Sequence, residues 1–132
     1  GPGTTVKTVA EELGIRDKTL LGVDAVHNGS IVGRDLDERG MLEILERYRR
    51  ACIVVSPIGG QGFIFGRGNQ QISPEVIRRV GPRNIVVVAT KHKLARTPVL
   101  RVDTGDPALD QELRGYLRVI ADYREEHVMR VM

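Results

Sequence analysis

A glycine-rich segment that directly follows a short apolar run constrains the fold of this chain more than any other feature. Residues 51–55 (Ala-Cys-Ile-Val-Val) are apolar and rich in β-branched side chains, which predicts a strand covered on both faces. The run ends at Ser56-Pro57, and five glycines follow within residues 58–69. Ordinary surface loops do not need this many glycines. The segment is either a tight bend or bulge at a sheet edge, which glycine content alone favours, or a corner where backbone N–H groups approach a ligand.

The remaining pattern predicts a mixed α+β fold. Asn28-Gly29 is a strong signal for a two-residue hairpin turn, and the polar residues 124–126 separate two further strand patterns near the end of the chain. Ser73-Pro74-Glu75 supplies a cap, a first-turn proline and an early acid, which is typical of a helix start. We therefore expect a β-rich mixed sheet or sandwich with hairpins and three or four short helices. The expected helices cover residues 5–13, 35 or 37 to 50, 73–81 and 107–113, and the expected strands 19–27, 31–34, 51–55, 85–88, 99–102, 116–123 and 128–131.

Length and composition fit one compact domain in a reducing compartment. Hydrophobic residues make up 41% of the 132 residues, which excludes a disordered chain, and no apolar run approaches the roughly 20 residues that cross a bilayer. The single cysteine, Cys52, excludes an intramolecular disulfide, and its apolar neighbours predict a buried packing residue. We therefore expect a cytoplasmic protein without membrane contact. His27, His92 and His127 lie too far apart in the sequence to predict a zinc site.

The familiar phosphate-binding and hydrolase motifs are absent from the glycine-rich segment. Gly62, Gly66 and Gly68 do not have the dinucleotide spacing Gly-x-Gly-x-x-Gly, and no Gly-Lys-Ser/Thr follows them. Ser56 lies in no nucleophile-elbow pattern, so a hydrolase has no support. The net charge is only +3, and aromatic residues are 4% of the chain. A nucleic acid partner is therefore disfavoured, because single strands are commonly bound on exposed aromatic rings.

Four segments together resemble the C-terminal domain of the ATP-dependent NAD kinase family. That family carries Thr-Pro-Thr-Gly-Ser-Thr-Ala-Tyr after a strand, with a proline eleven residues beyond the tyrosine. Residues 56–63 (Ser-Pro-Ile-Gly-Gly-Gln-Gly-Phe) followed by Pro74 have the same spacing. Residues 21–26 are similar to the family's ribose-binding strand. Residues 63–74 and 101–106 resemble the divergent branch of predicted polyphosphate/ATP-NAD kinases, which is related to the acetoin-catabolism protein X.

This resemblance implies half of an active site. The intact enzyme would convert NAD to NADP with ATP or polyphosphate, with magnesium accompanying ATP. An N-terminal α/β domain would supply a Gly-Gly-Asp-Gly-Thr motif whose aspartate activates the acceptor hydroxyl. Residues 103–106 (Asp-Thr-Gly-Asp) have a different order, so no catalytic residue is assigned to this chain. We expect residues 4–132 to be the NAD-binding domain, residues 1–3 to be a remnant of cloning, and the protein to form a homo-oligomer that is inactive without the missing domain.

The resemblance also implies which residues hold NAD. The family places an Asn-Glu or Asn-Asp pair on a strand against the ribose, and Asp24 stands in the acid's place, whereas Val23 replaces the asparagine. The other interpretation of Asp24 is a solvent-facing strand residue. The residues implied to contact the dinucleotide are Asp24, Ser56, Gly59, Gly60 and Gln61.

Polar residues elsewhere add two candidate groups. Arg67, Asn69 and Gln70 lie on or beside the glycine-rich segment, where we expect the guanidinium to clamp a phosphate and the amides to bond a base or ribose. The alternative for these residues is loop solubility and backbone hydrogen bonding. Residues 91–93 (Lys-His-Lys) follow a predicted strand, and we interpret them as a solvated corner in preference to an anion-binding site.

Two other functions remain open at the level of sequence. One is a non-catalytic nucleotide-sensing or oligomerisation domain of a divergent family member, which the replacement of asparagine by Val23 would fit. The other is a basic nucleic-acid-binding module, which the scarcity of aromatic residues disfavours.

Overall fold

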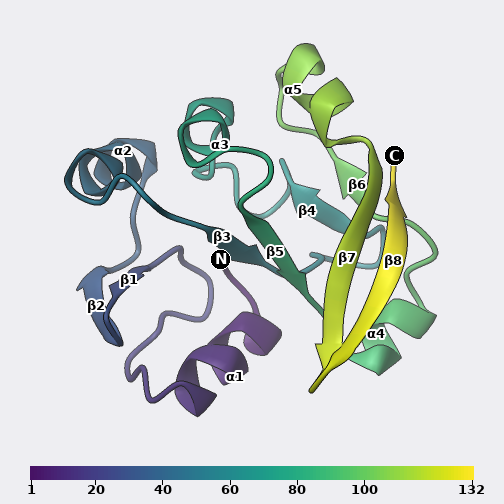
Figure 1. The fold of residues 1–132 in the computed structure, drawn as a ribbon, viewed down its shortest axis with the longest axis horizontal. Helices are drawn as coiled ribbons and strands as arrows, with labels where there is room; N and C mark the ends of the chain where they lie inside the picture. Colours follow the sequence, from purple (N-terminus) through teal and green to yellow (C-terminus); the bar gives the residue numbers. More distant parts are fainter.

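The computed structural model describes all 132 residues as an α+β domain (Figure 1). Its helices are α1 (Thr4–Glu12), α2 (Glu38–Arg47), α3 (Pro74–Val80), α4 (Lys91–Ala95) and α5 (Pro107–Leu113), and its strands are β1 (Ala25–His27), β2 (Ser30–Gly33), β3 (Ile53–Val55), β4 (Phe63–Phe65), β5 (Ile85–Val88), β6 (Arg101–Val102), β7 (Gly115–Asp122) and β8 (Glu125–Val131). The main sheet has the order β3-β5-β7-β8, and β1-β2 and β4-β6 form two smaller sheets. The predicted α+β class with a mixed sheet is confirmed.

Three of the four strands of the main sheet, β3, β5 and β7, are parallel to one another. β3 pairs with β5 and β5 with β7 in parallel, whereas β8 runs antiparallel beside β7. Each of these strands contributes one fully buried valine, at 0% exposure: Val55, Val87 and Val119. Because parallel strands point the same way, the carboxyl ends of β3, β5 and β7 meet at one edge of the sheet. The segments that follow these three strands therefore begin at the same edge.

Both predicted hairpins are present. Asn28 and Gly29 join β1 to β2 with φ angles of 50° and 78°, as the mirror-image hairpin turns require. Tyr123-Arg124 joins β7 to β8, and Arg124 also has a positive φ of 55°. This second turn is shorter than expected, because Glu125 and Glu126 already belong to β8.

All four predicted helices are present, and side-chain caps mark where three of them begin. Asp37, Ser73 and Asp106 accept hydrogen bonds from backbone N–H groups in the first turns of α2, α3 and α5. The segment after β5 was expected to be a solvated corner and instead forms α4, which Thr90 caps by accepting from Lys93 N at 3.1 Å. A helix of five residues is too short for hydrophobic periodicity to reveal. None of the helices has both the length and the apolarity to span a membrane.

The interior is a cluster of 16 buried hydrophobic residues that draws on the strands and on α3 and α5. Ile64 and Phe65 of β4 are 0% exposed, although no strand was predicted there. The prediction for Cys52 was wrong, since this residue is exposed. It precedes β3, which lies at the edge of the main sheet, so the apolar run is covered only toward its end at Val55.

Candidate functional site

The loop after β3 and the start of α4 come together at the carboxyl edge of the parallel strands (Figure 1). We call residues 56–62 the glycine corner. Lys93 Nζ, on α4 after β5, donates a hydrogen bond of 3.0 Å to the carbonyl oxygen of Gly59. Ligands of open parallel sheets bind beyond the carboxyl ends of the strands. The fold thus places the glycine corner and a lysine where such sheets hold their ligands.

Three glycines of the segment are required by packing against the chain itself. A Cβ atom on Gly66 would overlap the carbonyl of Asp103, and one on Gly62 would overlap the carbonyl oxygen of Val99. A Cβ on Gly68 would lie 3.0 Å from Ile58. For Gly62 and Gly66 the cause is the close pairing of β4 with β6, which brings the two backbones together, whereas Gly68 packs against the Ile58 side chain. For these glycines, the interpretation as a tight bend is sufficient.

Gly60 is different from every other glycine of the chain. The other glycines either have a positive φ or have a neighbour within 4 Å of the position of a Cβ atom. Gly60 has neither, and it is exposed. Its neighbour Gly59 also faces open space, but a positive φ of 67° explains the glycine there. Neither a packing contact nor a positive φ angle requires a glycine at position 60, so the backbone there is open to close approach by a ligand.

The rest of the glycine corner includes two polar side chains, Ser56 and Gln61. Gln61 is exposed, and Ser56 is 7% exposed. The Ser56 hydroxyl makes no hydrogen bond within the chain and is not fully buried, so it still reaches solvent. Lys93 forms no ion pair with a carboxylate, so its charge stays available at the corner. The sequence predicts a solvated Lys93, because the closeness of Lys93 to Gly59 depends on the pairing of β3 with β5, which local sequence patterns do not show.

Arg67 and Asn69 have different surroundings although both lie on the same loop. The Arg67 guanidinium is exposed, lies 4.7 Å from the centroid of the Phe63 ring and approaches Asp103 Oδ2 at 3.5 Å. Asn69 is 0% exposed, and its Nδ2 donates a bond of 2.8 Å to the carbonyl oxygen of Ile64. The expected contact of Asn69 with a base or ribose does not fit this position, because the amide lies inside the protein and braces the loop. Arg67 remains accessible to a ligand.

Asp24 is at the centre of a buried polar cluster rather than on an open strand. Its side chain is 0% exposed, and it accepts hydrogen bonds of 2.7 Å each from the backbone N–H groups of Thr19 and Asp35. The Thr19 hydroxyl bonds to the same carboxylate, and Lys18 Nζ lies 3.2 Å from Oδ2. Neither the expected ribose contact nor the solvent-facing alternative fits, because the chain already satisfies the carboxylate. Val23, in the place of the family's asparagine, is a core residue at 7% exposure.

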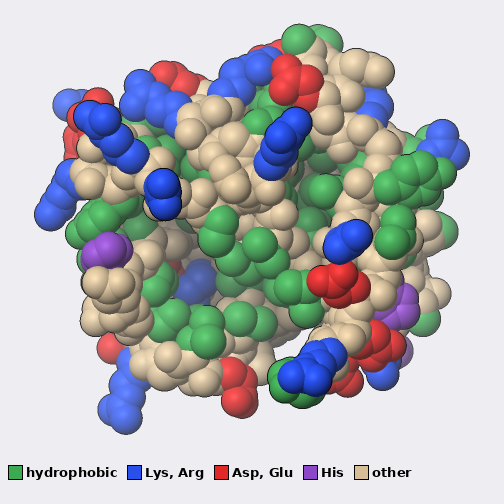
Figure 2. Space-filling model, in the orientation of Figure 1, with side chains coloured by type: hydrophobic (Ala, Val, Ile, Leu, Met, Phe, Trp, Pro, Cys, Tyr) green, Lys and Arg blue, Asp and Glu red, His purple; other side chains and the backbone are tan.

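Asp24 and the glycine corner do not share a cavity. Asp24 and Lys18 border a mainly apolar pocket of about 460 Å³ between α1, the β1-β2 hairpin, α2 and β3. In Figure 2 a hollow on the left of this face is surrounded by hydrophobic side chains, with a basic group at its base. None of Ser56, Gly59, Gly60 and Gln61 lines this pocket. The structure therefore brings together the glycine corner and Lys93, but not the corner and Asp24.

The metal-binding side chains are dispersed through the chain. Nowhere do three His, Cys, Asp or Glu side chains lie close enough to hold one ion. The residues present therefore do not fit a resident metal centre. The polar groups of the corner are instead neutral donors and a cation, which suit an anionic or hydroxyl-rich ligand.

This α+β domain presents an open glycine, and a lysine without a carboxylate partner, at the carboxyl ends of parallel strands, where sheets of this kind hold ligands. The family model of the ATP-NAD kinase C-terminal domain matches residues 1–131, and the chain belongs to this family. Comparison with curated proteins and with solved structures found no match. The family expected from the sequence is thus confirmed. The match includes residues 1–3, among which Pro2 is buried.

Proposed function

We propose that this chain is the NAD-holding half of an NAD kinase-like phosphotransferase, which in its intact form converts NAD to NADP with ATP or polyphosphate. The observation that carries the proposal is Gly60, an exposed glycine that has open space where a side chain would stand and therefore leaves its backbone accessible to a ligand. In this assignment the backbone N–H groups of the corner face the dinucleotide, and side chains around them supply hydrogen bonds and positive charge. The residues assigned to the dinucleotide are Ser56, Gly59, Gly60, Gln61, Arg67 and Lys93. Asp24 is left out because it holds the segment around Thr19 and Asp35, away from the corner, and Asn69 because it is buried against Ile64.

Phosphoryl transfer depends mainly on positioning and on charge stabilisation, so the two halves of such an enzyme can be carried by different domains. This domain, residues 4–132, would hold NAD. A further N-terminal domain would present ATP with its magnesium, or polyphosphate, and would contain the group that activates the acceptor hydroxyl. The support is that the family model describes a C-terminal domain.

The chain alone is expected to produce no NADP. When the purified domain is incubated with NAD, ATP and magnesium, NADP should stay at the level of the protein-free control in an enzymatic cycling assay. The reason is that the chain holds the acceptor but has no group placed to activate it. Sustained NADP formation by residues 1–132 would contradict the assignment of the catalytic residues to another domain.

Gly60→Val is expected to weaken NAD binding at least tenfold without changing stability. A branched side chain at this position would stand in open space in the free protein but would separate the backbone from a bound ligand. Isothermal titration calorimetry with NAD measures the effect, and thermal unfolding should show the same midpoint as the wild type. Ala108→Val is the matched control, because Ala108 is an exposed residue of α5 outside the corner. Equal NAD affinity of the wild type and Gly60→Val would contradict the site.

The second candidate is a non-catalytic nucleotide-sensing domain. Two observations favour it: Val23 is part of the core where the family has a ribose-binding asparagine, and Asp24 has no free hydrogen-bonding capacity. Calorimetry with NAD, NADP and ATP separates the candidates. Binding of ATP without NAD would favour sensing, whereas NAD binding supports the kinase half.

The proposal includes a cytoplasmic, self-associating protein. An exposed lone thiol, Cys52, suits a reducing compartment. The outer face of β7 and β8 exposes Tyr116 at 73% and Val128 at 68%, and β8 is an edge strand of the main sheet. Leu100 covers only the end of this edge, by bonding to Arg130 and Met132, and exposed apolar residues beside the open remainder favour contact with a second copy.

A further inference from the structure

The β3 edge of the main sheet carries backbone groups that no strand of the chain pairs with. β3 is the first strand in the order β3-β5-β7-β8, so only β5 lies beside it. Ile53 N donates to Asn84 O at 2.9 Å, which directs the backbone N–H and C=O groups of Ile53 toward β5. Because these groups alternate in direction along a strand, those of Cys52 and Val54 face the open edge. That edge receives one hydrogen bond, from Gly1 N to Val54 O at 2.9 Å.

Gly1 shows how the chain approaches this edge. Its bond to Val54 O is not accompanied by the reverse bond from Val54 N to Gly1 O, which a hydrogen-bonded antiparallel pair would make. A Cβ atom on Gly1 would lie 3.1 Å from a side-chain atom of Val55, at the carboxyl end of β3. In Figure 1 the chain continues from Gly1 toward the start of α1 in the direction in which β3 points, and α1 then runs back. This arrangement is typical of the last residue of a parallel strand that a turn joins to a helix.

The mainly apolar pocket of about 460 Å³ between α1, the β1-β2 hairpin, α2 and β3 lies along the same edge, since Gly1 and residues 52–54 line it. We call it the α1 pocket. Val6 and Ala10 of α1 are buried and also line it, but neither belongs to the cluster of 16 core residues. The helices that cover parallel sheets normally pack directly on the strands. Here the α1 pocket lies between α1 and the main core.

The side chains of β3 are less covered than its sequence predicts. Residues 51–55 are apolar throughout, which is typical of a strand covered on both faces. Of these residues only Val55 is fully buried, whereas Ile53 and Val54 are half-buried and Cys52 is exposed. Leu13, which also lines the α1 pocket, is 69% exposed. The composition of β3 therefore suits a strand in the interior of a sheet rather than at its edge.

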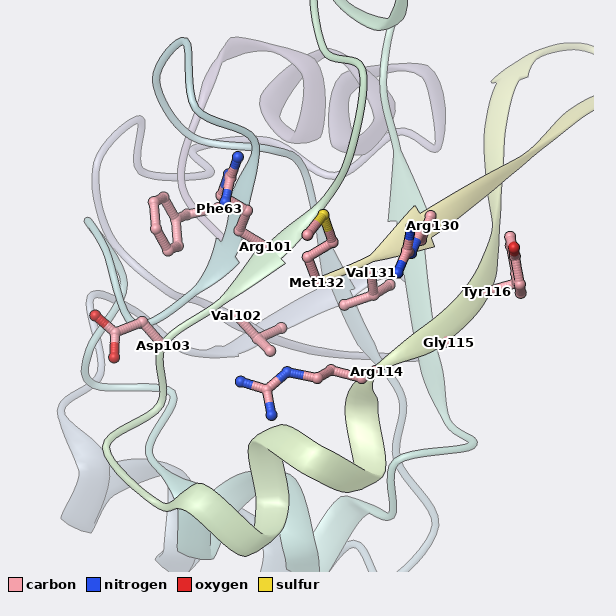
Figure 3. A pocket seen from close by; sticks show the side chains of 10 residues that line it. All are labelled: Phe63, Arg101, Val102, Asp103, Arg114, Gly115, Tyr116, Arg130, Val131 and Met132. Carbon is pink, nitrogen blue, oxygen red and sulfur yellow. The ribbon is translucent and has the colours of Figure 1, made fainter.

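A larger pocket, of about 710 Å³ between β6, the start of β7 and the end of β8, has no such open strand position (Figure 3). Gly115 pairs with Val131 on one side of it, and Leu100 N donates to Arg130 O at 2.8 Å on the other. Charged side chains of both signs border it. Of these two pockets, only the α1 pocket combines an apolar lining with an unpaired strand edge.

We propose that the segment directly preceding Gly1 in the intact protein forms a fifth strand of the main sheet, parallel to β3, and that its side chains fill the α1 pocket. The residue before Gly1 would lie opposite Val54, and Val54 N would donate to the carbonyl oxygen of the second residue before Gly1. The apolar lining requires apolar, largely β-branched side chains, as in β3 and β5. Residues 1–3 are then a native turn from strand to helix rather than a remnant of cloning. The inference rests on the proposed function in one respect, that this domain follows another part of a longer protein.

The surroundings of the Gly1 nitrogen suit an amide better than a charged group. Burial and the charge of Lys18 lower the pKa of the Gly1 amino group to about 5, against the opposite effect of Asp24. A peptide N–H would make the same bond to Val54 O without a charge to remove from water. The position therefore fits a residue in the interior of a chain.

Amide hydrogen exchange, resolved by NMR, tests the strand by comparing residues 1–132 with the intact protein. The Val54 amide should exchange about a hundredfold more slowly in the intact protein, because it gains an acceptor. The Ile53 amide is the matched control and should be protected in both, since it already donates to Asn84. Cys52, which is exposed in residues 1–132, should react with a maleimide about tenfold more slowly in the intact protein. Equal exchange of the Val54 amide in the two proteins would overturn the proposal.

A chain that begins about ten native residues before Gly1 separates the strand from the rest of the N-terminal part. Its thermal unfolding midpoint should exceed that of residues 1–132 by about 5 °C or more. The matched control carries proline at the second and fourth residues before Gly1, whose N–H groups would face β3, and its midpoint should return to that of residues 1–132. Equal stabilisation with and without the prolines would overturn the proposal, because apolar contact without strand pairing would then be sufficient.

NAD titration of residues 1–132 tests the proposed function separately, because the glycine corner is complete in that chain. NAD binding together with an unprotected Val54 amide in the intact protein would overturn this inference and leave the proposed function in place. Protection of the Val54 amide without NAD binding would support the fifth strand and contradict the proposed function.

Discussion

Gly66→Ala is expected to destabilise the protein by about 4 kcal/mol, which is among the largest losses of stability expected from adding one methyl group to this chain. A Cβ atom at position 66 would overlap the carbonyl of Asp103, and the φ angle of 92° is one that L-amino acids rarely adopt. Overpacking against rigid backbone and a disallowed conformation each cost about 1 to 3 kcal/mol. The backbone cannot move aside, because Asp103 N donates to Phe65 O at 3.1 Å. Urea denaturation followed by circular dichroism measures the loss.

Gly60→Ala is the control for this prediction. It adds the same methyl group to the same glycine-rich segment but into open space, and the free energy of unfolding should change by less than about 0.5 kcal/mol. If both variants lose the same stability, the division into packing glycines and an open glycine does not hold. The comparison also separates loss of fold from loss of ligand binding.

Local sequence signals predicted the elements whose geometry is set by neighbours in the chain. Asn28-Gly29 fixes its hairpin because both residues adopt positive φ angles, and Ser73-Pro74 starts α3 through a cap and a preset φ. β4 was missed because its partner, β6, lies 36 residues or more further along the chain. Cys52 was misplaced because an apolar run does not reveal that its strand lies at a sheet edge.

The candidate site was predictable as a group of glycines but not residue by residue. Spacing identifies the corner. The difference between Gly60, which faces open space, and Gly66, which packs against the backbone of Asp103, depends on the folded chain. The role of Lys93 likewise depends on the parallel pairing of β3 with β5, which places α4 beside the corner. Asp24 was assigned by position in a motif, and the sequence gives no sign that Lys18, six residues earlier, occupies its carboxylate.

Asp24→Asn is expected to lower the free energy of unfolding by about 3 kcal/mol at pH 7. The free energy of unfolding of the variant should also fall less than that of the wild type as the pH is lowered. Burial by itself would raise the pKa of Asp24, but hydrogen bonds from the backbone N–H groups of Asp35 and Thr19, the Thr19 hydroxyl and the charge of Lys18 outweigh it and lower the pKa. Removing one partner of a buried pair leaves the other charge uncompensated, which costs about 3 to 5 kcal/mol. Lys18 is 4% exposed and would be that charge.

The direction of the pH effect follows from the lowered pKa. A carboxylate whose pKa is lower in the folded state stabilises the protein fully above its ordinary pKa of about 4, and this stabilisation is lost as the pH falls through the folded value. The difference between wild type and Asp24→Asn in urea denaturation should therefore be largest near pH 7 and shrink below about pH 4. Asp106 and Glu125, whose pKa values are also lowered, keep part of the acid dependence in the variant.

Glu43→Gln is the control for Asp24→Asn, since it breaks an ion pair of 3.5 Å with Arg39 whose side chains are 67% and 89% exposed. Exposed pairs of this kind contribute about 0.3 to 0.5 kcal/mol, so its curve of stability against pH should follow the wild type closely. If Asp24→Asn lost as little stability at pH 7 as Glu43→Gln, the Asp24 carboxylate would not be holding the loop through its hydrogen bonds. In that case Asp24 would be free for the ribose contact that its place in the motif implies.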